Sequence, residues 1–166
     1  MANLPTFQSL SIRASVKDLL KGHQKYLAHT PGEQLSAHME LVLHYFLKLL
    51  EVHGLEPLLD KLFFKLAKDD PGVAGIAKKF FWETILYHDF GKVNENFQNQ
   101  RMENPEFPTN VRNGIDSQHS ILSAFIFLIH QISDGKVQNK ANGTNKLLSL
   151  AACFSHNIMR HHSSRL

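Results

Sequence analysis

Apolar side chains recur at intervals of three and four residues along most of the chain, rather than at alternating positions. This spacing places them on one face of an α-helix, so the sequence predicts an all-α fold. We expect helices over residues 33–52, 55–67, 73–90, 117–133 and 146–162. Gly54 should end the first of these helices, and Pro57 suits the first turn of the second. The polar segment 94–115 is predicted to be a loop with at most one helical turn.

Several apolar rows on these helices contain or end in a histidine or an aspartate. The rows are Leu35, Val42, Tyr45 or Phe46 and Leu49, which include His38; Ile76, Phe80 and Thr84, which end in His88; Phe81 and Ile85, which end in Asp89; Leu122, Ile126 and Ile129, which begin with His119; and Leu147, Leu150, Phe154 and Ile158, which end in His161 and His162. Because apolar rows face the core, we expect these polar side chains to meet between the helices.

A single inward histidine is usually a core residue with a backbone hydrogen-bond partner. Inward histidines on several helices, all near one carboxylate, are harder to explain as ordinary core residues. Burying Asp89 unpaired would cost at least several kcal/mol, and no lysine or arginine shares its rows. Imidazoles around one carboxylate are instead typical of a divalent metal site, and suit Mn, Fe, Co or Ni better than Mg. Asp89 has two oxygens, so it could bridge two ions.

Length and composition restrict the class of protein. The chain has 166 residues, a mass of 18.9 kDa and one cysteine, so we expect a single domain over 1–166 without an internal disulfide. Cys153 is expected to be a small buried side chain in a protein of the cytoplasm. No apolar stretch is long enough to span a membrane, and no signal peptide is recognisable. The net charge of +3 is too small to establish nucleic-acid binding, and Lys78 and Lys79 are expected on a solvated face.

The order of the motifs resembles that of the HD phosphohydrolase superfamily. His38, followed by the adjacent pair His88 and Asp89, matches the first motifs of that superfamily. The segment His88-Asp-Phe-Gly-Lys92, followed by Phe97-Gln98, narrows the resemblance. Together with Ser117-Gln-His119-Ser120, the pair His161-His162 and the upstream His29-Thr-Pro-Gly-Glu33, it is similar to the HD nuclease domain of the CRISPR-associated type I interference nuclease-helicase. The resemblance covers the chain from about residue 27 to its end. It predicts an HD-type helical bundle.

The resemblance implies a role for each matching residue. His38, His88 and Asp89 would hold one metal ion, whereas Asp89, His119, His161 and His162 would hold a second. Lys92 would lie beside the reacting phosphate, and Asp89 and Lys92 would be the catalytic residues. The family completes its first metal position with a further aspartate after the histidine pair, and no acidic residue follows His162 here. A nucleotide-binding motif of the fused helicase is also absent. We therefore expect that the chain is a fragment of a longer protein.

The resemblance further implies metal-dependent hydrolysis of phosphodiester bonds in DNA, preferentially single-stranded DNA, as part of CRISPR antiviral defence. The implied partners are single-stranded DNA, the helicase domain of the same parent protein and a CRISPR surveillance complex. A group of basic residues could contact the phosphate backbone: Lys92, Arg101, Arg112, Arg160 and Arg165.

Two alternatives remain open at this point. The domain could hydrolyse a small nucleotide or a cyclic dinucleotide, in which case its pocket should be enclosed. It could also be a catalytically incomplete HD domain that only binds partners, and the missing last aspartate favours this reading. The roles of His29 and His156 are not predicted.

Overall fold

A computed structural model describes residues 3–13, 15–107, 118–133 and 144–161. It confirms an all-α helical bundle, with one small two-stranded sheet. The elements are α1 (Phe7–Arg13), α2 (Val16–Leu19), β1 (Leu27–His29), β2 (Glu33–Gln34), α3 (Leu35–His53), α4 (Glu56–Leu66), α5 (Pro71–Tyr87), the 3₁₀ helix η1 (Phe90–Lys92), α6 (Glu95–Gln100), α7 (His119–Ser133) and α8 (Thr144–Arg160). No helix within the described ranges is long and apolar enough to cross a membrane.

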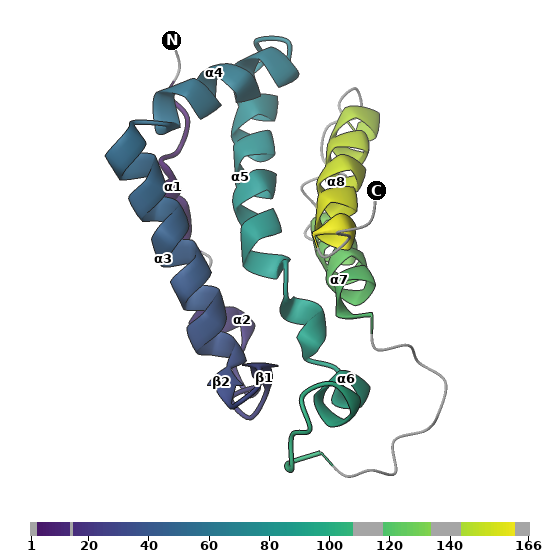
Figure 1. Ribbon diagram of the computed structural model, residues 1–166. Coiled ribbons are helices and arrows are strands. Elements are labelled where there is room, and N and C mark those ends of the chain that lie inside the picture. Colours follow the sequence, from purple (N-terminus) through teal and green to yellow (C-terminus); the bar gives the residue numbers. More distant parts are fainter. Residues whose placement is uncertain (1–2, 14, 108–117, 134–143, 162–166) are drawn as a thin grey trace.

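Helix α5 is the central element of the bundle. Figure 1 shows α3 on one side of α5 and the pair α7 and α8 on the other, and α8 packs against both α5 and α7. At its start, the carboxylate of Asp70 accepts hydrogen bonds from the backbone N–H groups of Gly72 and Val73, at 2.9 and 3.0 Å. Because this N-cap is followed directly by Pro71, α5 begins at residue 71 and not at residue 73 as expected.

The segment before α3 is a β-hairpin, not the first turn of a helix as predicted. Glu33 lies in β2 opposite His29 in β1, and the helix begins at Leu35. It ends as expected at Gly54, which adopts a left-handed conformation with φ of 58°. The hairpin therefore places Glu33 just ahead of the helix that carries His38.

The predicted inward row of α3 is wrong at Leu49, which is 50% exposed. Of the two alternatives at the preceding position, Tyr45 is 60% exposed and Phe46 packs against the core, and Met39, Leu43 and Leu50 are buried. Both sets of side chains are apolar and repeat at helical spacing, so the periodicity alone could not distinguish them. Packing against the neighbouring helices selects the row with Met39 and Leu43.

The predicted row of α8 is confirmed, because Leu147, Leu150, Phe154 and Ile158 are all buried. Cys153 was expected to be buried and is instead exposed. It lies one position away from Phe154 on the helix, and this step of about 100° turns it out of the buried row.

The N-terminal helices α1 and α2 were not predicted. Phe7 of α1 is fully buried and makes ring contacts with Phe46, Phe63, Phe81 and Trp82. A seven-residue helix shows too few turns for a clear periodic signal. The aromatic contacts from distant helices are what hold α1 in place.

Lys78 was expected on a solvated face, and the structure corrects this. Its side chain is fully buried, and Nζ donates to Glu56 Oε1 at 2.7 Å and to Asp60 Oδ1 at 2.6 Å. The same oxygen of Glu56 accepts the backbone N–H of Phe7 at 2.8 Å. This buried lysine therefore joins α1, α4 and α5.

Candidate metal centre

Asp89 lies where the chain leaves α5. The expected helix to residue 90 ends at Tyr87; His88 caps it, and η1 begins at Phe90. The backbone of Asp89, with φ of −111° and ψ of 4°, departs from helical geometry, and its carbonyl accepts the N–H of Lys92 at 2.9 Å. The side chain of Asp89 is only 1% exposed. This break in the helix points the buried carboxylate into the space between α3, α7 and α8.

The structure brings imidazoles from separate parts of the chain to both oxygens of Asp89. Oδ2 lies 3.2 Å from His38 Nε2 and 3.4 Å from His88 Nε2. Oδ1 lies 3.3 Å from His119 Nε2 and 3.2 Å from His161 Nε2. The ligand atoms of each half lie within 4.8 Å of one another, so each group could hold a metal ion. The predicted ligand His162 lies outside the described residues.

The orientation of two imidazoles identifies which nitrogen faces the carboxylate. His88 Nδ1 lies 2.7 Å from the carbonyl oxygen of Ile85, and His161 Nδ1 has the same relation to the carbonyl of Ile158. A carbonyl only accepts hydrogen bonds, so Nδ1 carries the proton. In the neutral ring, Nε2 then directs a lone pair at Asp89. Such lone pairs repel a carboxylate unless a cation or a proton lies between them, and this donor set fits a divalent transition metal.

Asp89 is ionised in this environment. Burial on its own would raise the pKa of Asp89. When the rings of His119, His161 and His88 carry a proton on Nε2 as well, as they can without a metal ion, their hydrogen bonds to the carboxylate and the charge of His88 hold that pKa far below its usual range. The carboxylate therefore stays available as an anionic ligand across the whole physiological pH range.

Lys92 supplies a basic partner that the apolar rows did not reveal. Its Nζ donates to Asp89 Oδ2 at 2.8 Å and to the carbonyl of Ala28 at 3.1 Å. The Lys92 side chain is 2% exposed. The resemblance implied that Lys92 lies beside the reacting phosphate. In the structure its ammonium lies against Asp89 and has almost no solvent-exposed surface. Its direct effect is on the charge and position of this carboxylate.

Gly91 allows η1 to approach α7 closely. Its N–H donates to Ser123 Oγ at 2.7 Å. A Cβ atom at this position would lie 2.0 Å from the carbonyl oxygen of His119 and 2.7 Å from the backbone nitrogen of Ser123. The absence of a side chain thus sets the distance between Asp89 and the helix that carries His119. The sequence indicated Gly91 only as part of a family motif.

Gln98 attaches the β-hairpin to the metal centre. The expected loop 94–115 contains the six-residue helix α6, and Gln98 on this helix is fully buried. Its Oε1 accepts the N–H of Leu27 at 2.8 Å, and its Nε2 donates to the carbonyls of Leu27 and Lys92 at 2.8 and 2.9 Å. Asn104 Nδ2 donates to the same Oε1 at 2.9 Å. Sequence reasoning missed this role, because Leu27 and Gln98 are 71 positions apart.

A third group of possible ligands adjoins the first. Glu33 Oε1 lies 3.4 Å from His38 Nδ1, on the side of the ring that faces away from Asp89. Glu33 Oε2 lies 4.0 Å from His29 Nε2, and the His29 side chain is about half exposed. Burial lowers the pKa of His29, as do the charges of Lys92 and His38. The hairpin thus adds a carboxylate and an imidazole to the edge of the site.

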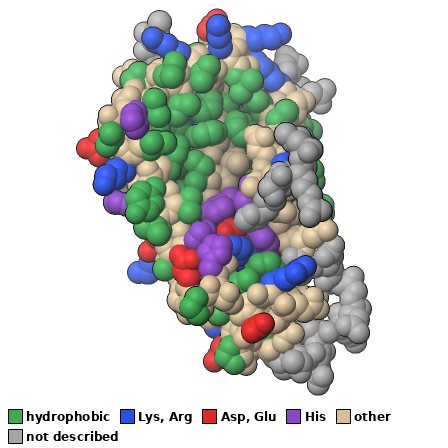
Figure 2. Space-filling view, in the orientation of Figure 1, with side chains coloured by type: hydrophobic (Ala, Val, Ile, Leu, Met, Phe, Trp, Pro, Cys, Tyr) green, Lys and Arg blue, Asp and Glu red, His purple; other side chains and the backbone are tan. Residues whose placement is uncertain are grey.

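The centre opens onto one face of the molecule. Histidine side chains gather at this surface, next to an apolar area over the upper part of the bundle (Figure 2). The side chains of His38, His88, His119 and His161 are between 14% and 20% exposed. Arg101 and Arg160 are exposed, and Arg112 and Arg165 lie outside the described residues. His156 is also exposed.

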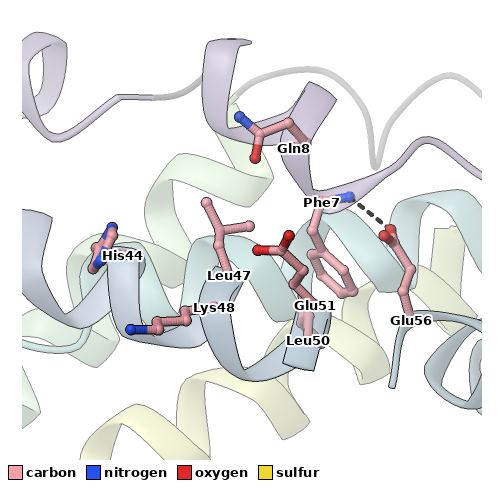
Figure 3. A pocket seen from close by; sticks show the side chains of 8 residues that line it. All are labelled: Phe7, Gln8, His44, Leu47, Lys48, Leu50, Glu51 and Glu56. Carbon is pink, nitrogen blue, oxygen red and sulfur yellow. Dashed lines mark hydrogen bonds between the residues drawn. The ribbon is translucent and has the colours of Figure 1, made fainter. Parts of the chain in front are cut away.

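A separate groove of about 770 Å³ lies between α1 and α3. Figure 3 shows its lining side chains, among them His44, Lys48 and Glu51. Glu56 in this groove is already bonded to the N–H of Phe7 and to Lys78. None of the predicted site residues that the structure describes lines this groove, so the imidazole cluster around Asp89 is the better candidate site.

No protein-family model matches the chain, and no curated protein or solved structure is significantly similar to it. The functional argument therefore depends on the geometry of the described residues.

Proposed function

We propose that the protein is a metal-dependent nuclease that hydrolyses phosphodiester bonds of single-stranded DNA. One observation carries the proposal. A buried, ionised carboxylate has imidazole nitrogens against both of its oxygens, at 3.2 to 3.4 Å. Paired metal positions bridged by a carboxylate are typical of enzymes that transfer or hydrolyse phosphoryl groups.

His38, His88 and Oδ2 of Asp89 would hold one ion, and Oδ1 of Asp89, His119 and His161 the other. His162 joins the second set by family resemblance. Bound ions would lower the pKa of a water molecule and withdraw charge from the phosphoryl oxygens. The imidazole-rich set favours Mn, Fe, Co or Ni over Mg.

The protein residues contribute orientation and charge. Asp89 would serve both positions, because its two oxygens face different pairs of imidazoles. The ammonium of Lys92 shares Oδ2 with His38 and His88, and so partly offsets the negative charge of Asp89. The carbonyls of Ile85 and Ile158 keep the Nδ1 protons of His88 and His161 in place. Each imidazole is thereby prepared to donate its Nε2 lone pair.

The open position of the histidine patch supports an extended substrate over a small nucleotide (Figure 2). A strand of DNA could lie along this face, where the four imidazoles are 14% to 20% exposed, whereas a small nucleotide is typically held in a concave pocket that buries most of its surface. By resemblance, the substrate strand would be delivered by a helicase domain and a CRISPR surveillance complex.

The test measures metal content and cleavage on the same protein samples. The chain is purified, loaded with Mn²⁺, Co²⁺ or Ni²⁺, and analysed for metal. It is then incubated with single-stranded DNA, duplex DNA and a cyclic dinucleotide. We expect metal-dependent cleavage of single-stranded DNA, and loss of both metal and cleavage in Asp89→Asn. The control is Asp69→Asn, at an exposed position with positive φ that asparagine also tolerates.

Single-ligand variants separate the two positions. His38→Gln and His119→Gln should each lower the occupancy of one ion, while His44→Gln, an exposed histidine on the same helix as His38, should change neither. Full metal occupancy in Asp89→Asn would exclude the bridging carboxylate. Hydrolysis of the cyclic dinucleotide alone would indicate a small-molecule enzyme, and bound metal without any cleavage would indicate a binding domain.

A further inference from the structure

The histidines around Asp89 differ in how their second nitrogen is held. His88 and His161 each lie beside the carbonyl of the residue three positions earlier. Both stand at the C-terminal end of a helix, where the last carbonyls have no partner within the helix and are free to accept. His38 has no such carbonyl, because it lies in the first turn of α3. Carbonyls there point into the helix and accept from the next turn.

We propose that Glu33 is a positioning residue that replaces this carbonyl for His38. Glu33 Oε1 is 3.4 Å from His38 Nδ1, while Nε2 of the same ring is 3.2 Å from Asp89 Oδ2. A carboxylate on Nδ1 keeps the proton on that nitrogen and leaves the lone pair on Nε2, directed at the ion position. The inference rests on the proposed function, since it assigns Glu33 to the support of that metal centre.

The surrounding structure makes Glu33 suitable for this role. It lies two residues before the first residue of α3, where the helix dipole favours a negative charge. Its strand, β2, pairs with β1, and β1 is bonded to η1 through Gln98 and Lys92. The support of His38 is thus attached to the same segment that follows Asp89. A movement of the hairpin would therefore displace the carboxylate of Glu33 together with the η1 segment that follows Asp89.

The alternative is that Glu33 only pairs with His29 to hold the hairpin, or that these two residues bind an ion of their own. His29→Ala removes the imidazole near Oε2 and leaves Oε1 beside His38. It also removes a ring contact with His38, with 4.8 Å between the centroids, so the tautomer of His38 is the readout that distinguishes these roles. Glu33→Gln retains an oxygen that can accept from Nδ1, and so it is the conservative partner of Glu33→Ala.

The first measurement uses metal-free protein and nitrogen-15 NMR of the histidine rings. We expect His38 to carry its proton on Nδ1 in the wild type, in Glu33→Gln and in His29→Ala, and to become a mixture of tautomers in Glu33→Ala. Unchanged His38 signals in folded Glu33→Ala would overturn the proposal. Thermal melting confirms that each variant is folded, and Glu33→Gln provides a second test if Glu33→Ala does not fold.

The second measurement is calorimetric titration of the same proteins with Co²⁺. Glu33→Ala should weaken the binding of one of the two ions by about 10- to 100-fold, as expected when the hydrogen-bond partner of a ligating histidine is removed. The affinity of Glu33→Gln should lie between those of Glu33→Ala and the wild type. His29→Ala should lose less affinity than Glu33→Ala, because it removes a ring contact with His38 but leaves the carboxylate beside Nδ1. His53→Ala, at an exposed position at the end of α3, is the control and should bind both ions as the wild type does. An equal loss in His29→Ala, or a third ion that disappears in it, would overturn the positioning role. A wild type that binds no ion would refute the proposed function, and the tautomer of His38 alone would then decide the role of Glu33.

Discussion

Lys92 Nζ lies 2.8 Å from Asp89 Oδ2, and both side chains are at least 98% buried. The 3₁₀ turn of η1 brings the two groups together across three positions. The pair accounts for a buried carboxylate that the apolar rows left without a cation. It also gives Lys92 a role in the fold and in the charge of the metal centre.

We predict that Lys92→Met lowers the free energy of unfolding by about 3 kcal/mol, because removing one partner of a buried ion pair leaves the other uncompensated. Urea unfolding of the metal-free protein measures this change. Lys48→Met, at an exposed position on α3, is the control and should change stability by less than about 0.5 kcal/mol. Wild-type stability in Lys92→Met would contradict a role of this ion pair in the fold.

We predict an acid-dependent loss of stability that depends on Asp89. The pKa of Asp89 is lowered in the folded protein from an ordinary value of 3.8. The unfolded chain therefore takes up a proton near pH 4 that the folded chain does not bind. The stabilisation is fully present above the ordinary value and is lost as the pH falls below it. Urea unfolding of the metal-free protein between pH 3 and 7 should show this fall, and Asp89→Asn should show a shallower one. Equal slopes would contradict the prediction.

Gly91→Ala should disrupt the metal centre, because the new methyl group would lie 2.0 Å from the carbonyl oxygen of His119. Overpacking of this kind costs about 1 to 3 kcal/mol or more, and the helix with His119 must move to relieve it. Thermal melting and metal content measure both effects. Gly75→Ala on α5 is the matched control, since a Cβ there would lie 4.0 Å from its nearest neighbour, Pro5 Cδ, and alanine favours helices. A Gly91→Ala protein with normal stability and metal content would show that η1 can move away from α7 at little cost.

Lys78→Met should lower the free energy of unfolding by about 2 kcal/mol. Loss of a buried ion-pair partner costs about 3 to 5 kcal/mol when the remaining charge stays buried. Glu56 and Asp60 are about 30% exposed and can be partly rehydrated, which reduces that cost. The triple variant Lys78→Met, Glu56→Gln, Asp60→Asn should recover part of the loss, because no unpaired charge remains. Lys61→Met, at an exposed position on α4, serves as the control. No recovery in the triple variant would indicate that the lysine stem, and not its charge, holds α1 against α5.

Local periodicity was enough to predict most helices and the polar residues that interrupt their apolar rows. His88, Asp89 and His161 were expected to meet because they end apolar rows that face the core. The row predicted for His119 is less accurate, since Ile129 is 47% exposed and Phe127 belongs to the buried face of α7. Helix caps are also determined by a few neighbouring residues. The end of α3 could therefore be predicted from Gly54, which adopts a left-handed conformation there. Both signals are local, because helical hydrogen bonds join residues four positions apart.

The remaining features depend on contacts between segments that are distant in the sequence. The inward row of α3 was predicted wrongly at Leu49, and the choice between Tyr45 and Phe46 stayed open, because neighbouring rows were equally apolar and only the packing partners distinguish them. Lys78 is buried because Glu56 and Asp60 of another helix reach its ammonium. Gln98 bonds a strand 71 positions away. Such contacts exist only once the helices have assembled, since each one joins groups that no local backbone hydrogen bond brings together.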